Sequence, residues 1–165
     1  MPVVNNVTRF LDAKKITYTA YETLSEKLGA VETARLLNLP AEQVFKTIVV
    51  VRSKPGKPIL ALIPGTGQAD LKMIASAVDE KKVSLPTEKE AEALTGLQAG
   101  GISPLALINK GFQVLIDSSA QKFSTINVSG GQRGLSIAIS PADLAMLTRA
   151  RFAPVASALE ADESG

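Results

Sequence analysis

Apolar residues recur along the chain at two spacings, one typical of helices and the other of strands. Val4, Val7, Phe10 and Leu11 follow the three-to-four-residue repeat of an amphipathic helix. Residues 16–22, ITYTAYE, alternate and are rich in β-branched and aromatic side chains, as strands are. Extended along the chain, these criteria predict helices at 4–14, 29–40, 69–78, 87–95 and 140–147, and strands at 16–22, 44–52, 59–63, 81–85, 112–117, 124–128 and 135–139.

Capping residues support two of these helices. Thr87 and Glu90 have the spacing of a capping box, and Gly96 stands where a glycine commonly ends a helix. Ser140 followed by Pro141 is a typical helix start. The helices at 87–95 and 140–147 are therefore predicted from their ends as well as from their periodicity.

Short turns join several of the predicted strands. SKPGKP at 53–58 predicts a hairpin between strands 44–52 and 59–63. Strands and helices do not alternate regularly. This favours a mixed or mainly antiparallel sheet, which could close into a barrel. With 165 residues and no internal repeat or linker, we expect a single α/β domain of the α+β type over 1–156, followed by a frayed acidic tail at 157–165.

Composition excludes several classes of chemistry. The chain has no cysteine and no histidine, so disulfides, thiolate nucleophiles, catalytic triads with histidine and the usual zinc sites are ruled out. An enzyme with this sequence must use Lys, Ser, Thr, carboxylates, backbone amides, water or groups on its substrate. The carboxylates show no paired spacing that suggests a metal site.

Charge and hydropathy place few limits on partners. The net charge is +2, from 18 basic and 16 acidic residues, which allows a local basic patch without diagnosing a nucleic-acid binder. Basic pairs at 14–15, 81–82 and 149/151 could contact a nucleic-acid backbone or form solvated surface. No run approaches the roughly 20 apolar residues of a membrane span, and the N-terminus lacks a secretory signal, so we expect a soluble cytoplasmic protein with no membrane partner.

One lysine interrupts the apolar run VFKTIVVV at 44–51. Regular pleating would place Lys46 on the same face as Val44, Ile48 and Val50. Its stem could lie on apolar surface while its head reaches water. Alternatively, its ammonium could point into a cavity and bind a carbonyl, a phosphate or a carboxylate.

Two glycine-rich segments could likewise be either ordinary loops or parts of a ligand site. In AGGISP, 99–104, adjacent glycines would let the backbone approach a ligand, although an ordinary helix-to-strand loop has the same composition. NVSGGQRG, 127–134, could form a hairpin turn, or a rim with Ser129 and Arg133 facing a polyanion. It is neither a P-loop nor a Rossmann fingerprint.

Together, VFKTIVV, GGISPL and VSGGQRGL, in this order and spacing, resemble the YbaK/EbsC family of free-standing aminoacyl-tRNA deacylases, over most of the chain. The family is similar to the editing insertion domain of bacterial prolyl-tRNA synthetases. The resemblance implies a largely antiparallel, barrel-like sheet surrounded by helices. It also implies a trans-editing activity that clears mischarged aminoacyl-tRNA, above all Cys-tRNA(Pro), without cofactor or metal. Prolyl-tRNA synthetase is the partner that the resemblance suggests for substrate delivery.

The resemblance also implies a set of site residues. Lys46 matches the family lysine needed for activity, and backbone amides around Gly101 would hold the substrate carbonyl. The residues expected to bind substrate are Tyr21, Leu28, Thr47, Gly100, Ile102, Ser103, Pro104, Ser129, Gly130, Arg133 and Ser136. Leu28 stands about where several members carry phenylalanine, and Ser136 where some carry aspartate, which bears on pocket shape, polarity and the cysteine preference.

In the thiol-specific branch of the family, the substrate's own cysteine sulfur attacks its ester and releases tRNA with a cyclic thiolactone. Such a reaction needs positioning and charge stabilisation rather than a protein nucleophile, which suits a chain without histidine or cysteine. Two alternatives remain: a water-dependent deacylase for Ala-tRNA(Pro) or another mischarged tRNA, and a non-catalytic module that binds a tRNA end or a nucleotide.

Overall fold

A computed structural model describes residues 4–23, 26 and 28–159 of the chain. Its α-helices are α1 (Asn6–Ala13), α2 (Ala30–Leu37), α3 (Leu71–Ala77), α4 (Glu88–Thr95) and α5 (Pro141–Thr148), with 3-10 turns η1 (Ala41–Gln43), η2 (Pro104–Ala106) and η3 (Ser118–Lys122). Its strands are β1 (Tyr18–Glu22), β2 (Phe45–Arg52), β3 (Ile59–Pro64), β4 (Gly67–Ala69), β5 (Val83–Ser84), β6 (Gln113–Asp117), β7 (Ile126–Ser129), β8 (Leu135–Ile139), β9 (Arg151–Ala153) and β10 (Ala156–Ala158).

Every helix and strand that the sequence predicted is present, with ends that differ by a few residues. The capping box of α4 is confirmed: the Glu90 amide donates to Thr87 Oγ1 over 3.1 Å, and the Thr87 amide donates to Glu90 Oε1 over 2.9 Å. Hydrogen bonding of the Glu90 carboxyl with the Thr87 backbone, and then with its side chain, holds the pKa of that carboxyl below its usual value. Gly96 ends the helix in the left-handed conformation, at φ 73°.

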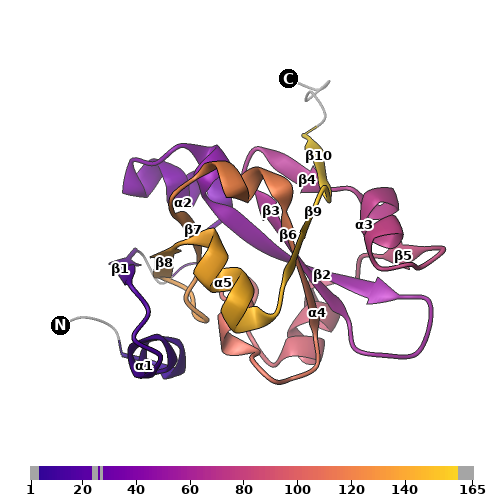
Figure 1. Ribbon diagram of the computed structural model, residues 1–165, viewed down its shortest axis with the longest axis horizontal. Helices are drawn as coiled ribbons and strands as arrows, with labels where there is room; N and C mark the ends of the chain where they lie inside the picture. The colour runs from indigo at the N-terminus through magenta and orange to yellow at the C-terminus, as the bar shows by residue number, and fades with distance from the viewer. Residues whose placement is uncertain (1–3, 24–25, 27, 160–165) are drawn as a thin grey trace.

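The strands form three sheets (Figure 1). The largest has the order β5-β2-β3-β6-β9; β2 runs antiparallel to β5 and β3, whereas the β3–β6 and β6–β9 pairs are parallel. A second sheet, β1-β8-β7, is antiparallel, and so is the β10–β4 pair. The expected α+β fold with a mixed, largely antiparallel sheet is confirmed, but the described strands do not close into a barrel.

Three short strands were not predicted. β4 lies in the segment 64–70 that leads into α3, and β9 and β10 follow α5. Each has three residues, too few for a periodic signal, and each exists because a distant strand pairs with it. β10 includes residues 157 and 158, which the sequence places in the expected frayed tail; residues 160–165 of that tail lie outside the described residues.

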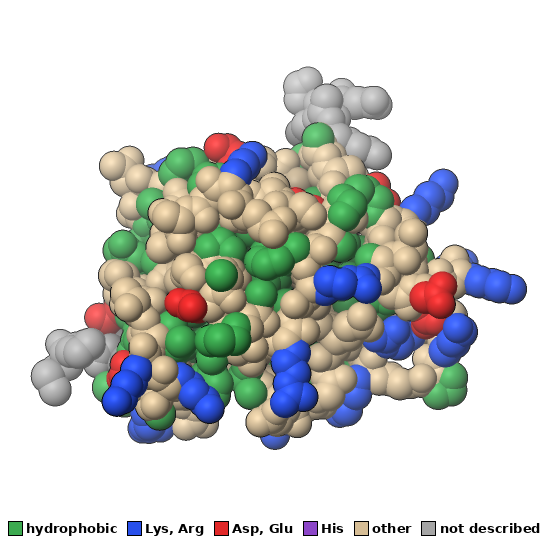
Figure 2. All heavy atoms as spheres, viewed as in Figure 1, with side chains coloured by type: hydrophobic (Ala, Val, Ile, Leu, Met, Phe, Trp, Pro, Cys, Tyr) green, Lys and Arg blue, Asp and Glu red, His purple; other side chains and the backbone are tan. Residues whose placement is uncertain are grey.

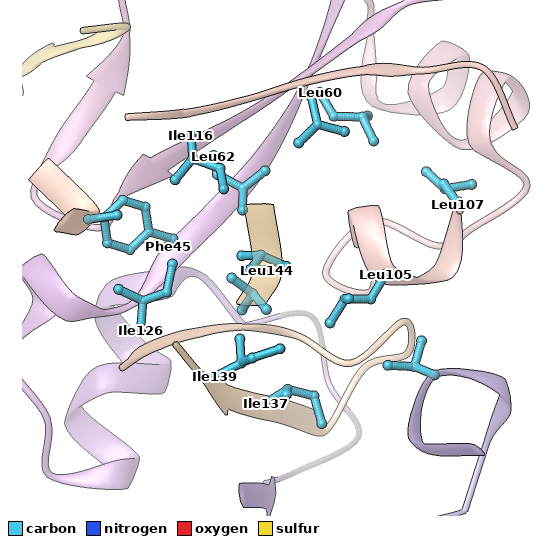
Figure 3. Close-up of a cluster of buried hydrophobic side chains, with 14 of the residues drawn as sticks. Phe45, Leu60, Leu62, Leu105, Leu107, Ile116, Ile126, Ile137, Ile139 and Leu144 are labelled. Atoms are coloured by element: carbon cyan, nitrogen blue, oxygen red, sulfur yellow. The ribbon is translucent and has the colours of Figure 1, made fainter. Parts of the chain in front are cut away.

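A large hydrophobic core lies between the two larger sheets. Strand β3 alternates, so Leu60 and Leu62 face this core while Ile59, Ala61 and Ile63 face a second cluster on the other side, against α3. Figure 3 shows side chains of the five-stranded sheet facing those of β7 and β8, with Leu144 of α5 among them; the residues are Leu60, Leu62, Ile116, Ile126, Ile137, Ile139 and Leu144.

Strand β2 belongs to one sheet and touches the other. Its last residues, Val51 and Arg52, pair with β5, and just before its first residue Val44 forms a parallel bridge with Asn127 of β7. Between these two points, residues 45–50 pair with β3 along one edge, and no described strand pairs with their other edge. This open edge faces the cavity described below.

Truncating Leu144 tests the core. Leu144 is fully buried between the sheets, so Leu144→Ala should lower the free energy of unfolding by about 2–5 kcal/mol. Met146 lies in the same helix but is 63% exposed, and Met146→Ala should change that free energy by no more than about 0.5 kcal/mol. Urea unfolding followed by circular dichroism measures both; equal losses for the two variants would contradict the assigned packing.

Candidate functional site

A cavity of about 390 Å³ opens along the unpaired edge of β2. Its floor is the strand segment 44–49, and the opposing walls come from the β7–β8 hairpin, the start of α2, the start of α4 and the loop 99–102. The volume falls in the range of small-ligand pockets. It is lined by Thr23, Glu26, Leu28, Gly29, Ala30, Thr33, Val44, Phe45, Lys46, Thr47, Ile48, Val49, Leu85, Pro86, Glu88, Ala91, Ala99, Gly100, Ile102, Val128, Ser129, Gly134, Leu135 and Ser136.

Lys46 is the only basic residue among the described residues that line this cavity. It lies opposite Ile63 in the β2–β3 pair and is half-buried, and burial lowers the pKa of its ammonium. Among the described residues no carboxylate forms an ion pair with it, so nothing in that part of the chain offsets the loss of hydration. An incompletely solvated, unpaired cation is well suited to attract an anionic or carbonyl oxygen.

The neighbouring threonine offers a second polar group. Thr47 Oγ1 is buried and has no hydrogen-bond partner among the residues that the structure describes. Buried hydroxyls in proteins almost always have a partner, and an unsatisfied one costs about 1–3 kcal/mol. Because Thr47 lines the cavity, a ligand or a water there can supply the missing partner.

Two serines line the wall formed by β7 and β8. Ser129 Oγ accepts a hydrogen bond from the Gly131 amide over 3.2 Å and so closes the turn of the predicted hairpin, which is confirmed. Ser136 is 5% exposed, and its Oγ accepts from Asn127 Nδ2 over 3.1 Å. The hydroxyl protons of both serines remain able to donate within the cavity.

The loop that carries the GGISP string contributes Ala99, Gly100 and Ile102 to the cavity lining. Gly101 is buried behind them; its amide donates to the Gln98 carbonyl over 2.8 Å, and a Cβ at Gly101 would lie 2.9 Å from Gln132 Cα. Ser103 is fully buried, accepts from the Leu105 amide and caps η2, where Pro104 takes the first position. Neither Gly101, Ser103 nor Pro104 lines the cavity.

Three more of the expected site residues lie outside the cavity lining. Tyr21 is on β1 opposite Ser136 and is 38% exposed. Gly130 is buried against Leu135, where a Cβ would lie only 2.5 Å from the leucine side chain. Arg133 is absent from the cavity lining, and its Nε donates to the Ala99 carbonyl over 2.7 Å.

The structure therefore brings together Leu28, Lys46, Thr47, Gly100, Ile102, Ser129 and Ser136 of the expected set. It adds the start of α2, with Gly29, Ala30 and Thr33, and the wall formed by Leu85, Pro86 and the first turns of α4. Leu85 is 54% exposed, an apolar side chain at the rim. Sequence periodicity gave no signal for these residues, because they reach the cavity only through the way the helices pack.

The described residues hold no cluster of three or more His, Cys, Asp or Glu that could bind a metal ion. Two carboxylates line the cavity, Glu26 and Glu88, and both are exposed at its margin. Within the described chain no helix is long and apolar enough to cross a membrane.

The described residues thus form an α+β domain whose cavity is lined by one lysine, several hydroxyls and part of a glycine loop. Residues 25–147 match the model of the aminoacyl-tRNA editing domain, and the chain belongs to this family of deacylases. It is 37% identical, over 91% of its length and 92% of the other's, to a protein of Enterococcus faecalis provisionally named a Cys-tRNA(Pro)/Cys-tRNA(Cys) deacylase, EbsC.

Two solved structures share the fold. The hypothetical protein APE2540 superposes with a TM-score of 0.84 at 23% identity, covering 93% of this chain and 100% of that one. A protein described provisionally as a trans-editing enzyme for prolyl-tRNA synthetase superposes with a TM-score of 0.76 at 22% identity, covering 94% and 99%. At these identities the likeness is one of fold.

Replacing Lys46 by methionine tests the burial of its charge. Burial lowers the pKa of Lys46 in the folded state, so its charged form destabilises the fold at pH 7, and this penalty fades as pH rises through the folded and then the unfolded pKa. Lys46→Met, which keeps the stem length, should therefore melt at or above the wild-type temperature at pH 7. The gap should close towards pH 10.5.

The matched control is Lys89→Met, at an exposed position of α4, which should show no such pH-dependent gap. Melting curves from neutral pH up to the ordinary lysine pKa for the three proteins measure the effect. A Lys46→Met protein that melts well below wild type at pH 7 would mean that the ammonium is stabilised by a partner in the fold.

Proposed function

We propose that the protein is a trans-editing deacylase that clears Cys-tRNA(Pro) by a reaction in which the substrate's own thiol is the nucleophile. Membership of the editing family supports the class, and the name of the Enterococcus faecalis relative supports the substrate. The observation that carries the proposal is the composition of the cavity: it presents the half-buried Lys46, which forms no ion pair with a described residue, beside hydroxyls and a glycine loop.

The buried part of the cavity favours the thiol route over attack by activated water. Thr47 and Ser136 lie in its interior, whereas Glu26 and Glu88 are exposed at its margin. The chain contains no histidine to take a proton from water. A substrate that brings its own nucleophile needs only to be held in an attacking conformation, a contribution that can reach about 7–11 kcal/mol of the barrier.

In the proposed reaction the cysteine sulfur attacks the ester carbonyl. The C–S bond forms as the ester C–O bond breaks, the thiol proton ends on the ribose oxygen, and the products are free tRNA and a cyclic thiolactone. Lys46 stabilises the negative charge that develops on the carbonyl oxygen or anchors the terminal nucleotide. Backbone groups of the loop around Gly101 hold the carbonyl, and Ala99, Gly100 and Ile102 are the members of that loop that line the cavity.

Selection for cysteine then has a chemical basis. Apolar contacts alone discriminate poorly between substrates of similar size, by about 10- to 200-fold per methylene. An amino acid without a thiol could occupy the cavity and still not react. Leu28 would limit the size of the side chain that enters, while Thr47, Ser129 and Ser136 provide hydrogen bonds to the substrate.

The partner is the acceptor end of a mischarged tRNA. Figure 2 shows Lys and Arg side chains projecting along the lower and right-hand margins of one face of the molecule. With a net charge of only +2, binding to tRNA should be weak and sensitive to salt. Delivery by prolyl-tRNA synthetase, in the cytoplasm where tRNA is charged, would compensate for the weak binding.

A panel of mischarged substrates tests the reaction. We expect release of tRNA from Cys-tRNA(Pro) and little or none from Ser-tRNA(Pro) or Ala-tRNA(Pro), because only cysteine carries a thiol. The measurement is loss of labelled amino acid from each substrate, with mass spectrometry of the cysteine product. Equal rates on the three would exclude the thiol mechanism, and preference for alanine would favour the water-dependent alternative. Binding with every ester left intact would indicate a non-catalytic module.

Lys46→Met should lower kcat/KM for the preferred substrate by about 10²- to 10³-fold, the range observed when one stabilising group is removed from an active site. Lys89→Met serves as the control for loss of a surface charge and should retain activity. Single-turnover deacylation measures both. A folded Lys46→Met protein with normal turnover would remove Lys46 from the mechanism.

A further inference from the structure

The peptide backbone at Ala99 is held from both sides by charged side chains. Its amide donates to Glu92 Oε2 over 2.7 Å, and its carbonyl accepts from Arg133 Nε, also over 2.7 Å. Glu92 comes from the second half of α4, and Arg133 comes from the β7–β8 turn. Two elements that are far apart in the sequence therefore fix one residue of the cavity loop.

Both contacts are strong hydrogen bonds. Each pairs a charged side chain with a backbone group, at a distance typical of charge-assisted hydrogen bonds. Ala99 is only 8% exposed, so water competes only partly for these bonds. Since Ala99 and its neighbour Gly100 line the cavity, the bonds act directly on the cavity wall.

The β7–β8 turn that carries Arg133 is itself anchored. Asn5, which caps α1, donates from Nδ2 to the Gly130 carbonyl over 2.9 Å and to Gln132 Oε1 over 3.0 Å. Gly101 packs so closely on the backbone of Gln132 that a Cβ would not fit, at 2.9 Å. The turn is thus a fixed support against which the loop is pressed.

We propose that Arg133 and Glu92 are positioning residues that set the 99–102 loop for catalysis, and that Arg133 does not bind a phosphate of the tRNA. The proposal deepens the deacylase function proposed above and rests on it. Arg133 donates its Nε to the Ala99 carbonyl and is absent from the cavity lining, where the proposed function places the terminal nucleotide. A shift of the loop by about 1 Å would displace the carbonyl site and lower the rate by about 100-fold.

Two substitutions of Arg133 separate positioning from phosphate binding. Arg133→Gln places an amide N–H at the same number of bonds from the backbone as Nε, so it keeps the donor and removes the charge. Arg133→Met has the same length without a donor. We expect Arg133→Met to lower kcat by about 10- to 100-fold with KM nearly unchanged, and Arg133→Gln to stay within about threefold of wild type.

The salt dependence of tRNA binding gives the second readout. If Arg133 bound a phosphate, removing its charge in either variant would reduce the slope of log K against log salt by about 0.7–0.9. We expect no change in slope for either variant. Arg9→Met, an exposed cation on α1, is the matched control for loss of a surface charge. Equal weakening by Arg133→Gln and Arg133→Met with a reduced slope, or normal kcat in Arg133→Met, would overturn the proposal.

Glu92 provides the same comparison from the other side of the peptide. Glu92→Gln keeps an acceptor for the Ala99 amide and should keep kcat, whereas Glu92→Met should lower it. If circular dichroism shows that Arg133→Met does not fold, the two Glu92 variants test the positioning role in its place. Normal kcat in a folded Glu92→Met protein would then overturn the proposal.

Hydrogen exchange distinguishes failure of this proposal from failure of the proposed function. In the free protein, Arg133→Met should speed amide exchange in residues 97–102 by about 10-fold or more, while Arg133→Gln should leave it near wild type. This readout needs no substrate. If wild type turns over none of the mischarged tRNAs, the function fails while the exchange data still test the positioning of the loop; unchanged exchange in Arg133→Met overturns the positioning role alone.

Discussion

The open edge of β2 is the constraint on which the rest of this structure depends. β3 pairs with one edge of the strand over residues 45–50. Among the described strands, the other edge is paired only at its two ends, by the bridge from Val44 to Asn127 and by the short strand β5. A sheet edge exposes backbone amides and carbonyls that need partners. Here that edge faces a cavity closed by α2, α4 and the β7–β8 hairpin, so the unpaired edge becomes the floor of the site.

The same arrangement explains how a lysine is tolerated in an apolar strand. Its neighbours Ile48 and Val50 pack against the second hydrophobic cluster, on the face where regular pleating also places Lys46. Lys46 lines the cavity, so its side chain borders space for a ligand instead of packing against other side chains. Burial lowers the pKa of Lys46, and no carboxylate among the described residues pairs with it; perturbed groups of this kind are common at functional sites.

An enzyme without histidine or cysteine depends less on reactive side chains and more on accurate placement of its substrate. In this protein the placement rests on backbone: a strand edge, a glycine loop and a serine-closed turn, each held by hydrogen bonds from elsewhere in the fold. Two residues outside the cavity lining make such bonds: Arg133 donates to the Ala99 carbonyl of the loop, and Asn5 donates to the turn that carries Arg133. Under the proposed mechanism, activity would depend on these residues although they lie outside the cavity.

Local patterns in the sequence predicted the longer helices and strands, the hairpins and the caps at Thr87 and Ser140, because each depends on residues within a turn or two of one another. The absence of histidine and cysteine likewise excluded whole mechanisms, and motif spacing indicated the family.

Only the tertiary structure decided which of the candidate residues meet. It placed Lys46, Thr47 and Ser136 in one cavity, turned Arg133 toward the Ala99 carbonyl, and formed β4, β9 and β10 from segments with no periodic signal. These outcomes depend on pairing and packing between segments far apart in the chain. A local pattern carries no information about which distant backbone group a side chain will find.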